Sequence, residues 1–519
     1  MLAYALPLLP PLLFAVAAVV SLTGPGFRPR VPQLFAEGVA LAAILVSAAC
    51  AVLLIKTGAG TSPLLGAFGV GLSARLDAVS VVMMLLVSFI GWIVVRYTGT
   101  YLDGEKRQGT LTGEICAVLA SVLLVVTAGN LAQLVAGWIG TGLFLNRLLV
   151  FYPERAAAQA AMRKRRAFSR IGDAALILAA ILLAATYGTS DIATILAAAK
   201  AAPLPAAGIA AAALVALAAI LQSAQFPTHG WLTEVMETPT PVSATLHAGI
   251  INAGGFLLIR FADLMLGAPL VLAALVLVGS FTALFGALVM LTQPAVKTSL
   301  AWSTVAQMGF MIMQCGLTLN AIALLHIVAH SLYKAHAFLT SGTAVDVVAA
   351  TRRPGPVAIP SARAVGRAFL IALAIYGVVG LAFGILEKPP QVVALGAILI
   401  FGVAYILAQG FADAAPRALT QWTAVYAVAT TVAYFSLQWL ADRLTSGVLP
   451  PPVAPDPLEW ALIALAVMTF AGVAVAQAMF PLWAFHPAAA GFRVHLSNGL
   501  YANAVIDRLL GRWSLRTSS

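Results

Sequence analysis

The chain has 519 residues, of which 61% are hydrophobic and only 9% are charged. Soluble globular domains carry about 25% charged residues, so this composition excludes an ordinary soluble protein. Apolar runs long enough to cross about 30 Å of hydrocarbon as helices recur along the whole chain, and they do not alternate with polar residues as strands of a membrane barrel do. The sequence therefore predicts an all-α polytopic membrane protein.

Taken in chain order, the apolar runs predict about 13 to 15 transmembrane helices. The candidate ranges are 2–22, 34–55, 77–96, 112–128, 130–150, 168–187, 205–240, 242–262, 269–292, 298–317, 320–347, 364–386, 391–411, 418–440 and 458–480. The first run has neither a basic start nor a small-residue cleavage site, so it is expected to be a retained span. The range 205–240 is too long for one crossing and contains Pro227, which predicts a broken helix.

The net charge of +11 is explained by topology rather than by nucleic-acid binding. Lys and Arg gather in the connections after odd-numbered runs, as in the segment Arg163 to Arg166 after the fifth run, and are sparse after even-numbered ones. Basic connections face the cytoplasm. We therefore expect a bacterial inner membrane protein with a periplasmic N-terminus and a cytoplasmic C-terminus, and with anionic lipids as partners.

The segment AQFPTHGWLTEVMETPTPVSATLHAGIINAGG, residues 224–255, places three prolines, two histidines and two glutamates between apolar runs. If a helix resumes after Pro227, His229 and Glu237 fall on one face, and Pro239 with Pro241 ends that helix. His247 then belongs to the next span. A solvated cytoplasmic loop is the alternative, but ionisable groups within membrane spans usually mark ion paths.

A second polar cluster lies in LLHIVAHSLYKAHAFLTSG, where His326, His330 and Lys334 are spaced four residues apart on one helix face. Histidine suits a proton relay because its ordinary pKa is near 6.5, and burial brings lysine toward the same range. Zinc ligation by the two histidines and simple helix packing are the alternatives. No third zinc ligand accompanies the histidines and the lysine would repel a metal, so no metal site is predicted.

Two further features concern the cytoplasmic side. Arg170 and Asp173 stand three residues apart at the start of a span, as an ion pair that is either structural or involved in gating. The tail LSNGLYANAVIDRLLGRW has apolar residues at helical spacing, which predicts an amphipathic helix on the membrane surface or against a partner. The three scattered cysteines indicate packing residues, and no nucleotide fingerprint or enzyme active site is recognisable.

The segment FPTHGWLTEVMETPTPVSATLHAGIINAGG resembles the hallmark of the antiporter-like subunits of respiratory complex I and Mrp antiporters. The blocks RLDAVSVVMMLLVSFIGWIVVRYTG, SRIGDAALILAAILL and VKTSLAWSTVAQMGFM resemble the same family and follow its order. The resemblance implies an antiporter-like fold with two inverted five-helix repeats and broken helices. We accordingly divide the chain into N-terminal helices 1–111, repeats 112–262 and 263–411, C-terminal helices 412–480 and a cytoplasmic amphipathic tail 481–519.

Within that superfamily, the segments NRLLVFYPER and VHLSNGLYANAVIDRLL are most similar to the DabB branch, the membrane subunits of two-component inorganic carbon transporters. The resemblance implies a partner similar to DabA, a cytoplasmic zinc protein that resembles a carbonic anhydrase. It implies that cation flow, of protons or Na⁺, drives conversion of CO2 to bicarbonate in that partner. Zinc is then expected in the partner and no cofactor in this chain.

The resemblance also implies which residues form the path and which are missing. His247, His326, His330, Lys334, Arg170 and Asp173 match family positions, and Glu237 lies in the matching turn. Complex I subunits carry a glutamate where this chain has Ile139 and a lysine where it has Gln222. Losing both members of an ion pair leaves no uncompensated charge, and it argues against a complete pump. A proton-pumping subunit of a respiratory oxidoreductase and a non-conducting membrane anchor are the alternative functions.

Overall fold

A computed structural model describes residues 2–24, 26–236, 238–342, 362–410, 417–478, 483 and 486–510. The first third of the chain forms η1 (Leu2–Leu8), α1 (Leu9–Thr23), α2 (Arg30–Thr57), β1 (Gly60–Thr61), β2 (Leu65–Ala67), β3 (Val70–Leu72), β4 (Arg75–Leu76), α3 (Ala78–Tyr101), α4 (Gln108–Val126), α5 (Leu131–Leu149) and α6 (Ala156–Tyr187). The short strands form two antiparallel pairs, β1 with β4 and β2 with β3.

The middle of the chain contains most of the shorter helices. It forms α7 (Ile192–Ala201), α8 (Ala206–Gln222), α9 (Gly230–Thr233), α10 (Thr240–Ala248), η2 (Ile250–Asn252), α11 (Ala253–Arg260), α12 (Ala262–Leu266), α13 (Pro269–Met290), α14 (Val296–Gly316) and α15 (Asn320–Leu339). The remainder forms α17 (Ala362–Ala382), η3 (Ile385–Glu387), α18 (Pro390–Gly410), α19 (Arg417–Thr445), α20 (Pro457–Ala478), η4 (Pro487–Ala489), α22 (Ala490–Ser497), η5 (Gly499–Tyr501) and α23 (Ala502–Leu509).

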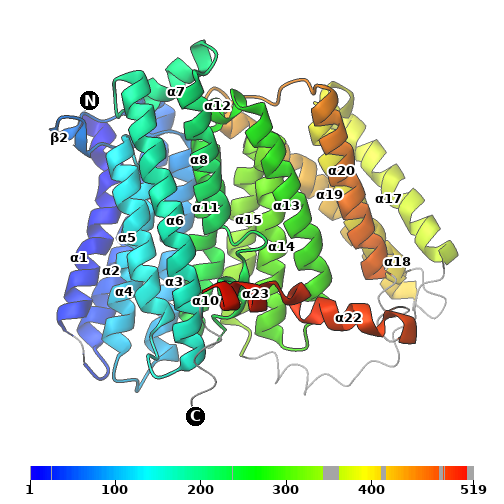
Figure 1. Cartoon of the computed structure of the whole chain (residues 1–519), viewed down its shortest axis with the longest axis horizontal. Coiled ribbons are helices and arrows are strands. Elements are labelled where there is room, and N and C mark those ends of the chain that lie inside the picture. The colour runs from blue at the N-terminus through cyan, green and yellow to red at the C-terminus, as the bar shows by residue number, and fades with distance from the viewer. Residues whose placement is uncertain are drawn as a thin grey trace.

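The long helices stand side by side along the long axis of the molecule, from α1 at one end to the group α17–α19 at the other, and α20 lies between α13 and α18 (Figure 1). Among the described residues, 12 helices are long and apolar enough to cross a membrane. Helices α5, α8 and α14 lie between them and contact neighbours on both sides. Each of the fifteen predicted ranges therefore contains a helix, and the chain is a multi-pass α-helical membrane protein.

Close packing of the central helices depends on small residues. Gly279 and Gly286 on α13 face Gly309 and Ala306 on α14, and a Cβ added at Gly309 would lie 2.5 Å from the Ala283 nitrogen. Without a hydrophobic driving force between helices in lipid, such small residues allow the backbones to approach and gain van der Waals contact. This packing holds α14, which contributes to the polar centre described below, against α13.

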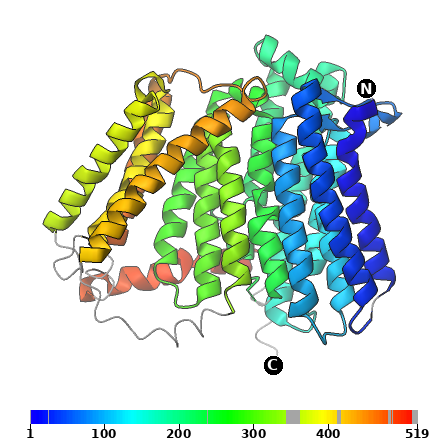
Figure 2. The same cartoon turned by 180° about the vertical axis from the view of Figure 1, so that it is seen from behind.

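Helix α19 is set apart by its tilt. It runs obliquely along the far face of the molecule (Figure 2), where it contacts α15 and α18. Its C-terminal end, at Thr445, lies on the same side of the molecule as the start of α15, at Asn320. This is also the side of the N-terminus, whereas the tail helices α22 and α23 cross the opposite side (Figure 1).

Candidate functional site

The polar segment 224–255 is a broken connection rather than a resumed helix. Helix α8 ends at Gln222, and only the four-residue α9 forms before α10 begins at Thr240. The prediction that His229 and Glu237 share a helix face is therefore wrong for His229, and Glu237 lies outside the described residues. Pro239 and Pro241 begin α10 instead of ending a helix, because a proline in the first turn sacrifices no helical hydrogen bond.

A second break, which the sequence analysis missed, divides the predicted span 242–262. Helix α10 ends at Ala248, the 3-10 turn η2 follows, and α11 begins at Ala253. The Asn252 amide donates to the Ala248 carbonyl at 3.2 Å and to the Ser331 hydroxyl of α15 at 3.0 Å. A backbone break inside a membrane protein is tolerated where the freed groups find such partners or line a cavity.

A narrow cavity of about 40 Å³ accompanies this break. Its wall is mostly apolar, but Gln222, Thr245, Asn252 and Ser331 contribute polar atoms. The volume suffices for about two or three water molecules, and the polar side chains are the partners such waters need. The structure thus brings Gln222, from the first half of the chain, to the same cavity as α15.

The predicted polar row on α15 is confirmed as a helix face. His330 and Lys334 are buried, with 5% and 0% exposure, and His326 is half-buried one turn earlier. The His326 Nδ1 donates to the Gln314 amide oxygen at 2.9 Å, and the His326 and His330 ring centroids are 5.9 Å apart. We call His326, His330 and Lys334 the polar row.

His247 of α10 joins the polar row through α14. The Lys334 ammonium donates to the Leu300 carbonyl at 2.9 Å, and the Thr304 hydroxyl donates to the same carbonyl at 3.0 Å. Because that hydroxyl proton is already used, His247 Nδ1 donates to Thr304 Oγ1, at 3.1 Å. The His247 ring stacks on Phe338, one turn beyond Lys334, with centroids 4.3 Å apart. Residues 87 positions apart in sequence therefore form one connected polar centre.

Several proton-accepting positions in this centre are unused. The Nε2 atoms of His247, His326 and His330 are buried and have no hydrogen-bond partner among the described residues. Lys334 forms no ion pair with a carboxylate within 4 Å in the described part of the chain. Buried polar groups are normally satisfied, and exceptions are typical of sites where protons or water move. No cluster of three metal-binding side chains occurs among the described residues.

His229 is buried but separate from the polar row. Its ring lies in an aromatic cage of Phe226, Phe285 and Trp302, with centroids 5.0 to 5.7 Å away. Neither ring nitrogen has a hydrogen-bond partner in the described structure. The structure therefore does not link His229 to His247 or Lys334 by hydrogen bonds, and its role in a path stays a prediction.

The predicted Arg170–Asp173 ion pair is not formed in the described structure. Arg170 is exposed, whereas Asp173 accepts from the Ser169 hydroxyl at 3.4 Å and faces Arg165 two turns earlier on α6. Asp173 is half-buried and Arg165 is buried, but no ion pair within 4 Å joins them among the described residues. Arg170 and Asp173 nevertheless line one polar pocket of about 740 Å³ together with Ile139.

That pocket also contains a carboxylate that sequence reasoning missed. Glu114 lies on α4 with 7% exposure, and its Oε2 has no hydrogen-bond partner among the described residues. Arg107 and Arg147 line the pocket beside it. The signal was available, since Glu114 is an acid within the apolar run 112–128. Ile139 thus lies in a polar pocket that contains two acids, Glu114 and Asp173.

The tail helices dock on the chain itself. Residues 487–510, which we call the strap, cross the lower part of the central helices in Figure 1, and Asp507 pairs with the buried Lys164 ammonium at 3.0 Å. Lys164 also pairs with Glu234, just after α9, at 2.6 Å. The Asn503 side chain lies directly against Gly230 of α9. The predicted amphipathic helix therefore covers the broken connection on this side of the molecule.

Replacing Asp507 with alanine is expected to loosen the strap without unfolding the protein. Lys164 keeps Glu234 as its counter-ion, so no buried charge is left unpaired. Loss of one charge-assisted contact should increase trypsin cleavage within the strap roughly tenfold. Limited proteolysis in detergent measures this rate. Asn498→Ala is the control, because the Asn498 amide donates only within the strap, to Val494; equal cleavage of both variants would contradict the proposed docking.

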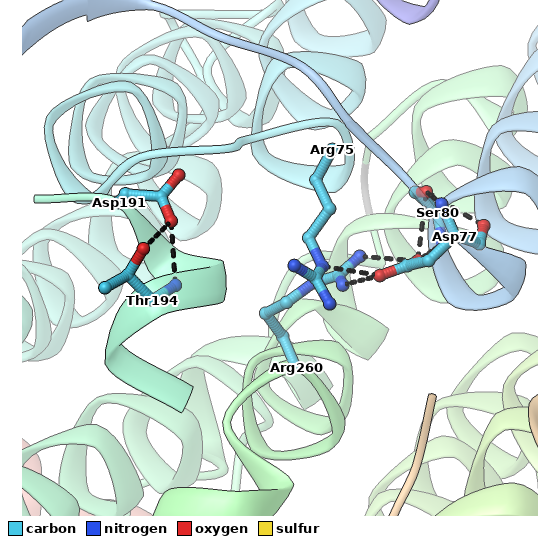
Figure 3. A network of polar contacts seen from close by, with 6 residues as sticks. All are labelled: Arg75, Asp77, Ser80, Asp191, Thr194 and Arg260. Carbon is cyan, nitrogen blue, oxygen red and sulfur yellow. Dashed lines mark hydrogen bonds and ion pairs between the residues drawn. The ribbon is translucent and has the colours of Figure 1, made fainter. Parts of the chain in front are cut away.

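On the opposite side, a buried ion cluster anchors the second half of the broken helix (Figure 3). Asp77 caps α3 by accepting from the Ser80 nitrogen, and it receives Arg260, the last residue of α11, at 2.5 Å and Arg75 at 2.7 Å. Burial alone would raise the pKa of Asp77, but the two guanidinium groups hold the pKa well below its usual range. The nearby Asp191 is a separate helix cap, bonded to Thr194.

A membrane-spanning helix broken between α10 and α11, a buried lysine–histidine row and a multi-pass helical frame are the features of an antiporter-like membrane subunit. Two family models agree: residues 128–353 match the NADH:quinone oxidoreductase/Mrp antiporter transmembrane family, and residues 64–110 match the N-terminus of complex I chain 5. The fold is similar to an Mrp complex from Dietzia (TM-score 0.62, 23% identity, 97% of this chain and 59% of that chain). It is also similar to a chain of complex I from Thermus thermophilus, with a TM-score of 0.55 and 18% identity over 96% of this chain and 99% of that chain.

Proteins of similar sequence assign the chain to one branch of the antiporter-like subunits. The chain is 35% identical over 463 residues to a probable inorganic carbon transporter subunit, DabB2, of Halothiobacillus neapolitanus, covering 88% of this chain and 83% of the relative. A DabB subunit of Hydrogenovibrio crunogenus is 42% identical over 51% of this chain and 52% of its own length. Complex I chain 5 of Metridium senile is 34% identical over 53% of this chain and 46% of its own length. The chain belongs to the DabB family of inorganic carbon transporter subunits, within the antiporter-like superfamily.

Proposed function

We propose that this chain conducts protons across the membrane and thereby drives inorganic carbon accumulation by a cytoplasmic partner. One observation supports this above all: His247, Thr304, the Leu300 carbonyl and Lys334 form a continuous buried hydrogen-bonded connection. The adjacent His326 and His330 each offer an unused ring nitrogen. The Leu300 carbonyl accepts from both Thr304 and Lys334 and so holds these groups in place without passing a proton itself. The histidine rings accept a proton at one nitrogen and release it from the other, which a packing stripe of apolar residues would not do.

The direction of the proposed conduction follows from what the first half of the chain lacks. Ile139 and Gln222 stand where the family's glutamate and lysine would form a second proton-transfer pair. Without that pair, an uphill pump of the complex I type has no loading site in the first repeat. We infer that protons or Na⁺ move through this path down their electrochemical gradient, and that the partner uses the energy released. Gln222 and His229 are also part of the proposed path, as is Glu237, which lies outside the described residues.

The proposed partner is a DabA-like cytoplasmic protein that holds zinc and converts CO2 to bicarbonate. Zinc suits that chemistry because it lowers the pKa of bound water to about 7. The relatives' description as subunits of an inorganic carbon transporter supports a partner of this kind. In this proposal the chain lies in the bacterial inner membrane with the strap and the basic connections on the cytoplasmic side, where anionic lipids also bind. The chain itself contributes no cofactor and no enzymatic step.

A second candidate function is ion translocation as part of a respiratory oxidoreductase or an Mrp antiporter. The match of residues 128–353 to the antiporter family model favours it. Affinity purification of the chain in mild detergent separates the two functions. A co-purifying soluble protein with bound zinc supports the inorganic carbon complex, whereas quinone oxidoreductase or Mrp subunits would support the second function.

The proposed path is tested by replacing His247 with alanine. In a bacterium that lacks carbonic anhydrase, wild-type chain and partner are expected to restore growth in ambient air. His247→Ala should abolish that growth, because Lys334 then loses its connection through Thr304. His336→Ala is the matched control, since His336 is an exposed histidine on α15, two residues beyond Lys334. Full growth of a normally expressed His247→Ala strain would contradict the proposed path.

A further inference from the structure

A polar pocket opens on the side of the molecule opposite the strap, where α15 begins. Its volume is about 370 Å³, and it is lined by the first residues of α15, the start of α18, and the end of α19 with the following loop. Asn320 and Ile322 come from α15, whereas Lys388, just before α18, and Asp442 of α19 bring opposite charges. We call this space the outer pocket, because the distribution of basic residues assigns this side to the periplasm.

The outer pocket has buried polar atoms in its wall, which suit water rather than lipid. Gln438 is 1% exposed, and its amide oxygen has no hydrogen-bond partner among the described residues. The Thr318 hydroxyl is also buried and has no hydrogen-bond partner among the described residues. The Asn320 amide donates to the Thr318 carbonyl at 3.3 Å. Buried polar atoms in a space of this volume indicate bound water, since leaving them dry would cost the desolvation energy of each.

The register of α15 connects the outer pocket to the polar row. Ile322 lines the pocket and precedes His326 by four residues, so both lie on one helix face about 6 Å apart along the axis. Residues 322, 326, 330 and 334 therefore form one line from the pocket to Lys334. Ile322 is 6% exposed and packs with Leu319 and Val392, so an apolar layer one side chain thick separates the pocket from His326.

From this arrangement we propose that the outer pocket is the periplasmic mouth of the proton path and that Ile322 is its apolar gate. Protons enter through the water of the pocket, beside Asp442 and Lys388, and reach the free Nε2 of His326 when the layer at Ile322 is wetted. Apolar constrictions of this kind gate conduction by excluding water. This inference rests on the proposed function, since it assigns an entrance to the same path.

Accessibility of the pocket is tested first, by a measurement that does not depend on conduction. Asn320→Cys should react with a membrane-impermeant methanethiosulfonate reagent added from the periplasmic side of intact spheroplasts. The wild-type chain is the background control, because Cys50, Cys116 and Cys315 are all buried. Absence of labelling at position 320 in folded protein would overturn the outer pocket as a water-filled mouth.

The gate is tested by proton flux into liposomes that contain the purified complex. Ile322→Ser should raise the flux roughly tenfold by allowing water into the apolar layer, and Ile322→Phe should lower it by a similar factor. Val393→Ser is the matched control, because Val393 is the next residue of α18 but is 37% exposed and belongs neither to the pocket lining nor to the apolar layer. If Ile322→Ser does not fold, the flux through Ile322→Phe still tests whether Ile322 is the gate.

The outcomes separate this inference from the proposed function. Flux in the wild type that both Ile322 substitutions leave unchanged, or that Val393→Ser raises as much as Ile322→Ser does, would overturn the gate while leaving conduction intact. A wild-type complex without any flux would overturn the proposed function itself. Raised flux in Ile322→Ser, lowered flux in Ile322→Phe and wild-type flux in Val393→Ser would support the inference.

Discussion

Replacing Lys334 with alanine is expected to reduce inorganic carbon uptake to background, a loss of about 100-fold or more, as for removal of an essential proton-transfer group. Lys334 is fully buried and donates to the Leu300 carbonyl, which also receives Thr304 and, through it, connects to His247. Without the ammonium group, the polar row ends at His330. Uptake of labelled bicarbonate by cells that express the chain with its partner measures the effect.

Two further substitutions show whether loss of uptake reflects proton transfer. Lys334→Arg keeps the positive charge, but a guanidinium group does not release its proton at physiological pH. We therefore expect Lys334→Arg to remain near background as well. Lys200→Ala, at an exposed lysine at the end of α7, should retain wild-type uptake. Substantial uptake by Lys334→Ala at normal expression would favour the non-conducting membrane anchor.

The largest expected effect on stability comes from Asp77→Asn. Asp77 is fully buried and receives both Arg260 and Arg75, so neutralising it leaves the guanidinium of Arg260 buried without its counter-ion. Breaking a buried pair in this way costs about 3–5 kcal/mol of the free energy of unfolding. The apparent melting temperature in detergent and the yield of monodisperse protein should both fall.

The same substitution at an exposed pair supplies the control. Asp103 pairs with Arg28 at 2.8 Å, but the two side chains are 55% and 56% exposed. Exposed ion pairs contribute about 0–1 kcal/mol, so Asp103→Asn should leave the melting temperature nearly unchanged. Equal shifts for the two Asp→Asn variants would show that the cluster at Asp77 does not anchor α11.

The helical frame and the α15 row were predictable because they depend on local pattern. Apolar length places the spans, and spacing by four residues places His326, His330 and Lys334 on one face whatever surrounds them. The proximity of His247 was only implied by the family resemblance. Its contact through Thr304 depends on how α10 and α14 pack, which no local pattern specifies.

Other parts of the site could not be predicted, because a proline is compatible with more than one local structure and because the sequence does not specify which distant residues pair. Pro239 and Pro241 can end one helix or begin the next, and the structure uses them to begin α10. Arg260 is 183 residues from Asp77, so their pairing appears only in the folded chain. Likewise, the amphipathic tail was recognisable, but its docking through Asp507 on Lys164 was not.

The most direct test of the account is proton flux through the purified complex in liposomes, driven by a potassium diffusion potential and followed with an internal pH dye. The wild-type complex is expected to acidify or alkalinise the interior according to the sign of the potential. Lys334→Ala should show only the leak of empty liposomes, with Lys200→Ala equal to wild type. Equal flux in Lys334→Ala and wild type would contradict conduction through the polar row.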